Sequence, residues 1–101
     1  MTPEKKVKNK VVKILKANDC YHFYASTGGY GSSGVPDIIA CYKGMFLGIE
    51  CKANGNKPTA LQNRNLSEIR KAGGYSMVID ETDLDALELF FKKQDINLLR
   101  G

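Results

Sequence analysis

The chain has 101 residues and a formal net charge of +4, with 43% hydrophobic and 26% charged residues. This composition excludes a disordered chain, and the length predicts one domain over residues 1–101. No apolar run approaches the roughly 20 residues that cross a bilayer, and the first residues lack the apolar core of a secretory signal. We therefore expect no membrane partner and a cytoplasmic protein, in the host cytoplasm if the chain is viral.

The charges are unevenly distributed along the chain. Residues 1–79 carry 12 Lys and Arg against 5 acids, whereas residues 80–101 carry 3 against 6. A basic surface attracts a polyanion such as DNA, although lysine-rich helices are also simply soluble. The three cysteines form no Cys-x-x-Cys, so we expect small buried thiols in a reducing compartment and no zinc.

The first predicted element is a helix over Pro3–Ala17. Thr2 is a suitable N-cap, Pro3 suits the first turn, and a stripe of aliphatic residues recurs at helical spacing. Glu4 lies at the end of that stripe. From the sequence alone its expected role is to complement the positive end of the helix dipole.

A short strand is predicted next, over Cys20–Ala25, because of its aromatic residues. His22 is the sole histidine, so a catalytic triad is poorly supported and we expect a packing role. The Gly- and Ser-rich segment 26–34 lacks the Gly-Lys-Ser/Thr ending of a phosphate-binding loop, which excludes a nucleotide cofactor. It is predicted either to clamp DNA or to be a plain connection, and the candidate DNA contacts are Tyr30, Ser32 and Ser33.

A hairpin follows, with strands over 38–42 and 45–52 and a reversal at Lys43-Gly44. A two-residue loop places Asp37 directly opposite Glu50, and Lys52 projects from the same face as Glu50. Two opposed carboxylates need a cation between them or a shared proton. Such a face can bind a hard divalent metal and orient a water, although Glu-x-Lys also occurs on solvated strands.

The remaining elements are a polar loop over Asn54–Pro58, a helix over Ala60–Ala72, a strand over Tyr75–Ile79 and a helix over Asp83–Lys93. Thr59 and Gln62 fit a capping box, which gives Gln62 a structural role. Lys57 in the loop is placed to meet phosphate. The predicted fold is α/β, in the order αβββαβα, with a mixed four-stranded sheet flanked by helices.

Pro36-Asp37 followed by Glu50-Cys51-Lys52 across a hairpin resembles the PD-(D/E)XK nuclease superfamily. The continuation Lys57-Pro58-Thr59-Ala60-Leu61-Gln62, and the later Gly73-Gly74 before an apolar strand, resemble its virus-type replication-repair nuclease (VRR-NUC) family in the small stand-alone form. The likeness runs from about Pro3 to Phe91. The chain differs at Gly31–Gly34, where relatives often carry basic residues.

The resemblance implies a restriction-endonuclease-like core and metal-dependent DNA hydrolysis, with Asp37, Glu50, Lys52 and Gln62 as catalytic residues. It implies that Asp37, Glu50, the backbone carbonyl of Cys51 and also Glu4 bind Mg²⁺ or Mn²⁺, while Lys52 acts on the water. It further implies a homodimer that cuts branched DNA resembling a Holliday junction. Two alternatives remain open: a restriction- or repair-type nuclease on duplex or flap DNA, and a catalytically vestigial DNA-binding module.

Overall fold

The computed structural model describes residues 1–25 and 34–100. The elements are α1 (Pro3–Ala17), β1 (Tyr21–Tyr24), β2 (Ile38–Tyr42), β3 (Met45–Cys51), α2 (Ala60–Lys71), β4 (Tyr75–Ile79) and α3 (Leu84–Arg100). This order confirms the predicted one. No helix in the described ranges is both long enough and apolar enough to span a membrane.

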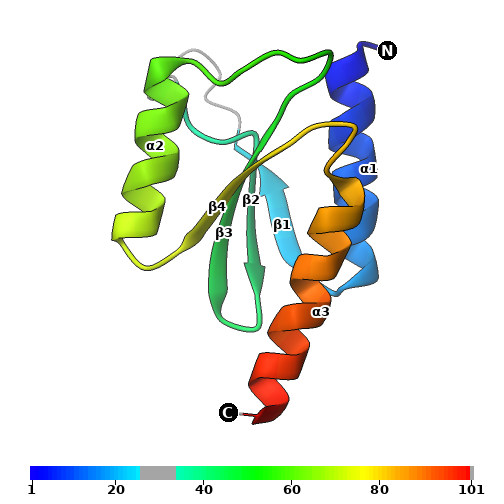
Figure 1. Cartoon of the computed structure of the whole chain (residues 1–101), viewed down its shortest axis with the longest axis vertical. Coiled ribbons are helices and arrows are strands. Elements are labelled where there is room, and N and C mark those ends of the chain that lie inside the picture. The colour runs from blue at the N-terminus through cyan, green and yellow to red at the C-terminus, as the bar shows by residue number, and fades with distance from the viewer. Residues whose placement is uncertain (26–33, 101) are drawn as a thin grey trace.

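The four strands form one mixed sheet in the order β1-β2-β3-β4. Strands β1, β2 and β3 are antiparallel neighbours, and β4 runs parallel to β3 after the crossover through α2. Figure 1 shows α2 on one side of the sheet and α1 with α3 on the other. The sheet is therefore the middle layer, with its main apolar core on the side of α1 and α3.

The local signals of α1 explain its position on the sheet. The side chain of Thr2 accepts a hydrogen bond from the Lys5 backbone N–H at 3.1 Å, which caps the helix as predicted. Val7, Val11 and Leu15 are buried on one stripe, and they pack in the same core as Ile38 and Ile49 of the central strands. This stripe fixes which face of α1 points toward the sheet.

The predicted two-residue hairpin loop is confirmed. Lys43 and Gly44 adopt φ values of 49° and 85°, as the favoured tight hairpin turns require, even though lysine is unusual there. The resulting register pairs Ile38 with Ile49. One step beyond this pair, Asp37 lies across from Glu50, as the sequence predicts.

Three expectations need correction. Helix α3 does not end near Lys93 but continues to Arg100, because Asp95 accepts hydrogen bonds from the Tyr42 hydroxyl and the Lys43 ammonium of the hairpin. Cys41 is exposed rather than buried, because it points to the face of β2 away from the main core. Strand β1 is also shorter than expected, at four residues.

Candidate active site

Asp37 and Glu50 hold one another through a reciprocal pair of hydrogen bonds. The backbone N–H of Asp37 donates to Oε1 of Glu50 at 3.1 Å. The backbone N–H of Cys51, next to Glu50, donates to Oδ2 of Asp37 at 2.8 Å. Each carboxylate is thus oriented by a backbone N–H from the facing segment of the hairpin. These two hydrogen bonds hold the pair in place, and no third side chain is needed to do so.

The Glu50 carboxyl is almost fully buried, at 1% exposure. Burial first, and then the negative charge of Asp37, raise the pKa of Glu50 to about 7. Its Oε2 has no hydrogen-bond partner within the described ranges. A buried acceptor without a donor is costly, so this atom is suited to a cation.

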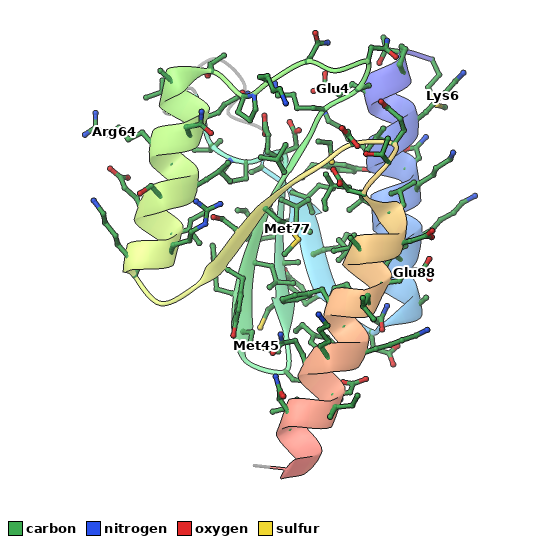
Figure 2. The ribbon with its side chains drawn as sticks, viewed as in Figure 1. Glu4, Lys6, Met45, Arg64, Met77 and Glu88 are labelled. Atoms are coloured by element: carbon green, nitrogen blue, oxygen red, sulfur yellow. The ribbon has the colours of Figure 1, made fainter. Side chains whose placement is uncertain are left out.

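Lys52 connects this pair to α1. Its ammonium lies 3.5 Å from Oε2 of Glu50, an ion pair at the outer limit of hydrogen-bond length, and 4.0 Å from Oε1 of Glu4. Figure 2 shows Glu4 on the side of α1 toward the sheet, while Lys6 points outward. The first turn of α1 therefore brings Glu4 to the site, beyond its expected role at the helix dipole.

Lys8 is part of the site and was missed by the sequence analysis. Its ammonium lies 3.5 Å from Oδ1 of Asp37. Lys8 follows Glu4 by four residues, so both lie on one face of α1. That spacing was the available signal, but a lysine in a lysine-rich helix is usually solvated.

The other predicted residues lie farther out or outside the described ranges. Gln62 forms the capping box: its Oε1 accepts from the Thr59 N–H at 2.9 Å, and the Thr59 hydroxyl accepts from the Gln62 N–H at 3.1 Å. Lys57 is exposed in the loop before α2. Tyr30, Ser32 and Ser33 lie outside the described residues. The roles of all five in catalysis or DNA binding stay predictions.

The donor set fits a hard divalent cation. Mg²⁺ is commonly held by one or two carboxylates, with waters and substrate phosphates completing its shell. Asp37 and Glu50 supply two carboxylates, although no group of three or more His, Cys, Asp and Glu side chains forms a metal site in the described ranges. Burial and then the charge of Asp37 raise the pKa of the Cys51 thiol to about 12, so this thiol stays neutral and only its carbonyl is a suitable ligand.

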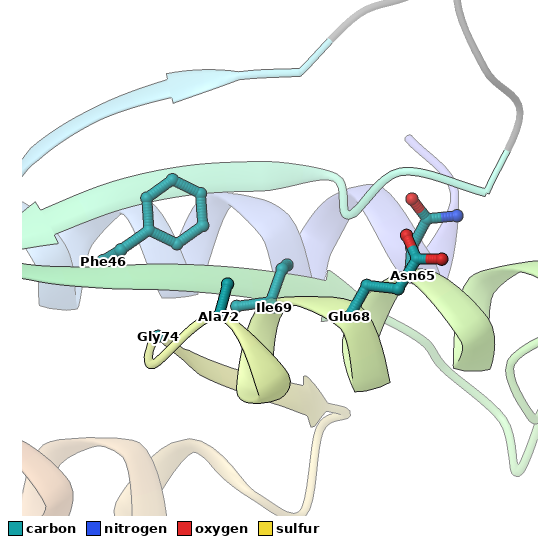
Figure 3. A pocket seen from close by; sticks show the side chains of 6 residues that line it. All are labelled: Phe46, Asn65, Glu68, Ile69, Ala72 and Gly74. Carbon is teal, nitrogen blue, oxygen red and sulfur yellow. The ribbon is translucent and has the colours of Figure 1, made fainter.

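A separate groove lies between the hairpin end of β3 and the C-terminal half of α2. The groove has a volume of about 450 Å³. Figure 3 shows the residues that line it: Phe46, Asn65, Glu68, Ile69, Ala72 and Gly74. None of the carboxylates or ammonium groups of the candidate active site lines this groove.

Residues 5–77 match the family model of the archaeal Holliday junction resolvase, Hjc. The chain belongs to the Hjc family. The match spans α1, the hairpin, α2 and most of β4, and thus contains Lys8, Asp37, Glu50 and Lys52. The predicted nuclease activity is confirmed at the level of the family.

Relatives agree with this assignment. The chain is 38% identical over 81 residues to a putative nuclease p44 of Acyrthosiphon pisum secondary endosymbiont phage 1, covering 79% of this chain and 84% of that protein. The fold is similar to a VRR_NUC domain, with a TM-score of 0.72 and 24% identity over 86% of this chain and 95% of that one. It also resembles Hjc, a Holliday junction resolvase from Archaeoglobus fulgidus, with a TM-score of 0.56 and 21% identity over 76% and 65% of the two chains. The predicted VRR-NUC-type fold is thereby confirmed.

Proposed function

We propose that this Hjc-family nuclease is a Mg²⁺- or Mn²⁺-dependent DNA endonuclease that cuts branched DNA of the Holliday-junction type. The observation that carries the proposal is the Asp37–Glu50 pair, with its unsatisfied Oε2 beside the Lys52 ammonium. A pair of acids with one buried oxygen that accepts no hydrogen bond is suited to a hard divalent cation.

Asp37, Glu50 and the Cys51 carbonyl would hold the cation, and Glu4 would extend the ligand set. When bound, the cation supplies positive charge where negative charge develops on the phosphate. Lys52 would orient the attacking water by donating a hydrogen bond to its oxygen, because its ammonium lies beside Glu50 and Glu4. Lys8 pairs with Oδ1 of Asp37, the carboxylate oxygen that the Cys51 N–H does not bind, and contributes positive charge near the phosphate.

We propose that the working unit is a homodimer. Each chain carries one Asp37–Glu50 pair, whereas a four-way junction must be cut on two strands. Two copies related by a two-fold axis would present two sites to the two-fold symmetric junction. A cytoplasmic location fits the free thiols of Cys20, Cys41 and Cys51.

The test is cleavage of a four-way junction, a flap and a matched linear duplex in Mg²⁺, in Mn²⁺ and in EDTA. We expect metal-dependent nicks placed symmetrically in the junction, and Asp37→Asn and Glu50→Gln should each abolish them while leaving the fold intact. Cleavage of duplex or flap alone would support the restriction- or repair-type alternative. DNA binding without cleavage in any metal would indicate a vestigial site.

A further inference from the structure

A second hollow adjoins the candidate active site, between the first two turns of α1 and the end of β1. It is lined by Thr2, Glu4, Lys5, Lys8, Asn9 and Tyr24, and has a volume of about 460 Å³. Ligand pockets commonly measure about 300–1,000 Å³. Two of its residues also contact the site, since Glu4 lies 4.0 Å from Lys52 and Lys8 lies 3.5 Å from Asp37.

Tyr24 is the aromatic wall of this hollow. It pairs with Ile38 at the end of β1, and the next residue, Ala25, donates its N–H to the Asp37 carbonyl at 2.9 Å. The Tyr24 backbone is therefore fixed one step from Asp37. Its side chain is nevertheless 53% exposed. A half-exposed aromatic side chain on a backbone fixed next to Asp37 is therefore available to a ligand.

Lys5 is the lysine of this hollow whose ammonium is not paired with a carboxylate of the described residues. Lys8 is paired with Asp37. Lys5, on the first turn of α1, is exposed and makes no ion pair with any residue that the structure describes. An unpaired ammonium and an exposed aromatic side chain in one hollow match the two parts of a nucleotide, its phosphate and its base.

We infer that the hollow between α1 and Tyr24 is a subsite for one unpaired nucleotide next to the scissile phosphate. Tyr24 stacks on its base, and Lys5 contacts its phosphate. A base within a duplex is already stacked on both sides, so only an unpaired nucleotide can use the ring. The subsite rests on the proposed nuclease function and would take a nucleotide that comes unpaired at the branch point, where the stacking of the arms is interrupted.

The first test measures the affinity of the whole protein for a fluorescent single-stranded oligonucleotide and for a blunt duplex, in EDTA so that no strand is cut. Tyr24→Ala should weaken single-strand binding at least about fivefold, the lower end for loss of one base–aromatic stack, and duplex binding less than about twofold. Tyr24→Phe should keep wild-type affinity because it keeps the ring. Tyr21→Ala is the matched control: Tyr21 lies on the same strand and is 73% exposed, but it does not line the hollow.

The phosphate contact is tested by the salt dependence of single-strand binding. Lys5→Ala should reduce the slope of log affinity against log salt by about 0.7. Lys6, the next residue along the helix, does not line the hollow and points outward from α1 in Figure 2, so Lys6→Ala gives the nonspecific effect of losing one charge. Equal slope changes in both variants would overturn the Lys5 contact.

A third readout locates the base directly. An oligonucleotide with one 5-iodouracil, irradiated in the complex, should crosslink to Tyr24 when that base is unpaired and not when it is paired. Tyr24→Ala that binds like wild type, or a crosslink that maps elsewhere, overturns the subsite. If wild type then still cuts DNA in Mg²⁺, only the subsite has failed; if it neither binds nor cuts DNA, the nuclease proposal fails with it.

Discussion

The buried carboxyl of Glu50 makes the stability of the metal-free protein depend on pH. Burial and the charge of Asp37 raise the pKa of Glu50 to about 7, whereas in the unfolded chain it returns to an ordinary value near 4.3. Between these two values the folded state binds more protons than the unfolded state. The free energy of unfolding should therefore fall as pH rises from about 4.5 to 7, and then level off, by at most about 4 kcal/mol.

Denaturant unfolding in EDTA at pH 5 and at pH 8 measures this difference. Glu50→Gln should remove most of it and should be the more stable protein at pH 8, because the amide needs no ionisation. A hydrogen bond from Thr82 lowers the pKa of Asp80, and one from Tyr42 lowers the pKa of Asp95. The contributions of these two groups to stability therefore change only at lower pH. An equal fall in Glu50→Gln would show that another group is responsible.

In the proposed mechanism Lys52 acts on the water and the two acids hold the cation, so the loss of Lys52 should have a different effect from the loss of either acid. Lys52→Ala should reduce cleavage by about 10²-fold, the size of effect expected when the attacking water is no longer held in position. Calorimetric titration with Mn²⁺ should still show binding. Lys43→Ala is the control, because Lys43 is paired with Asp95 at the hairpin turn, far from the site. A Lys52→Ala protein that cuts DNA normally would make Lys52 a structural ion-pair residue only.

At the scale of the element, α2 begins with a capping box formed by two residues. Variants of these two residues can distinguish an effect on stability from an effect on activity. Thr59 and Gln62 each accept the other's backbone N–H. Thr59→Ala should cost about 1 kcal/mol of stability and leave cleavage intact. Gln62→Ala should cost a similar amount and also reduce activity, as its predicted site role requires. Thermal unfolding and cleavage rates of both variants, measured well below their midpoints, distinguish the two; equal activities would leave Gln62 with the cap alone.

Most elements were predictable because their signals are local. The cap at Thr2, the apolar stripe of α1 and the tight turn at Lys43-Gly44 each depend on residues close in sequence. The turn then fixes the register of the two strands. The sequence alone therefore predicts that Asp37 lies opposite Glu50. The alternation of side chains likewise placed Lys52 on the face of Glu50.

What could not be predicted depends on contacts between distant residues. The last turns of α3 are held by Asp95 against Tyr42, 53 positions away, and no local signal marks that extension. Lys8 and Tyr24 join the site only because α1 and β1 meet beside Asp37. In the sequence one is a lysine among lysines and the other an aromatic in a strand, so neither is distinguishable from its neighbours.

At the scale of the whole molecule, the functional groups gather at one end of the sheet. Asp37 and Glu50 lie at the strand ends opposite the β2–β3 turn, where α1 begins, and α3 runs past that turn at the other end (Figure 1). The last 22 residues carry most of the acids, while the basic residues lie in the part that builds the site. A polyanion should therefore approach from the α1 end and leave α3 free.

We expect α3, which this approach of DNA leaves free, to be the surface on which two copies pair. Leu89 and Ile96 are 50% and 49% exposed and seven residues apart, so they lie on one face of the helix. Apolar side chains aligned in this way are suited to a helix–helix contact across a two-fold axis. We expect sedimentation at micromolar concentration to give twice the 11.2 kDa chain mass. The double variant Leu89→Asp, Ile96→Asp should sediment as a monomer, because each charge would be buried unpaired in that contact.

The same variant links assembly to junction cutting. It leaves Asp37, Glu50 and Lys52 untouched, so a linear duplex should be nicked at the wild-type rate, if slowly. Paired cuts in a four-way junction should be replaced by single nicks, because the second site is no longer held in place. Tyr21→Asp, at an exposed aromatic position on the edge strand β1, should leave mass and paired cutting unchanged. If the wild-type chain sediments as a monomer and cuts junction and duplex equally well, the nuclease chemistry stands but the dimeric resolvase does not.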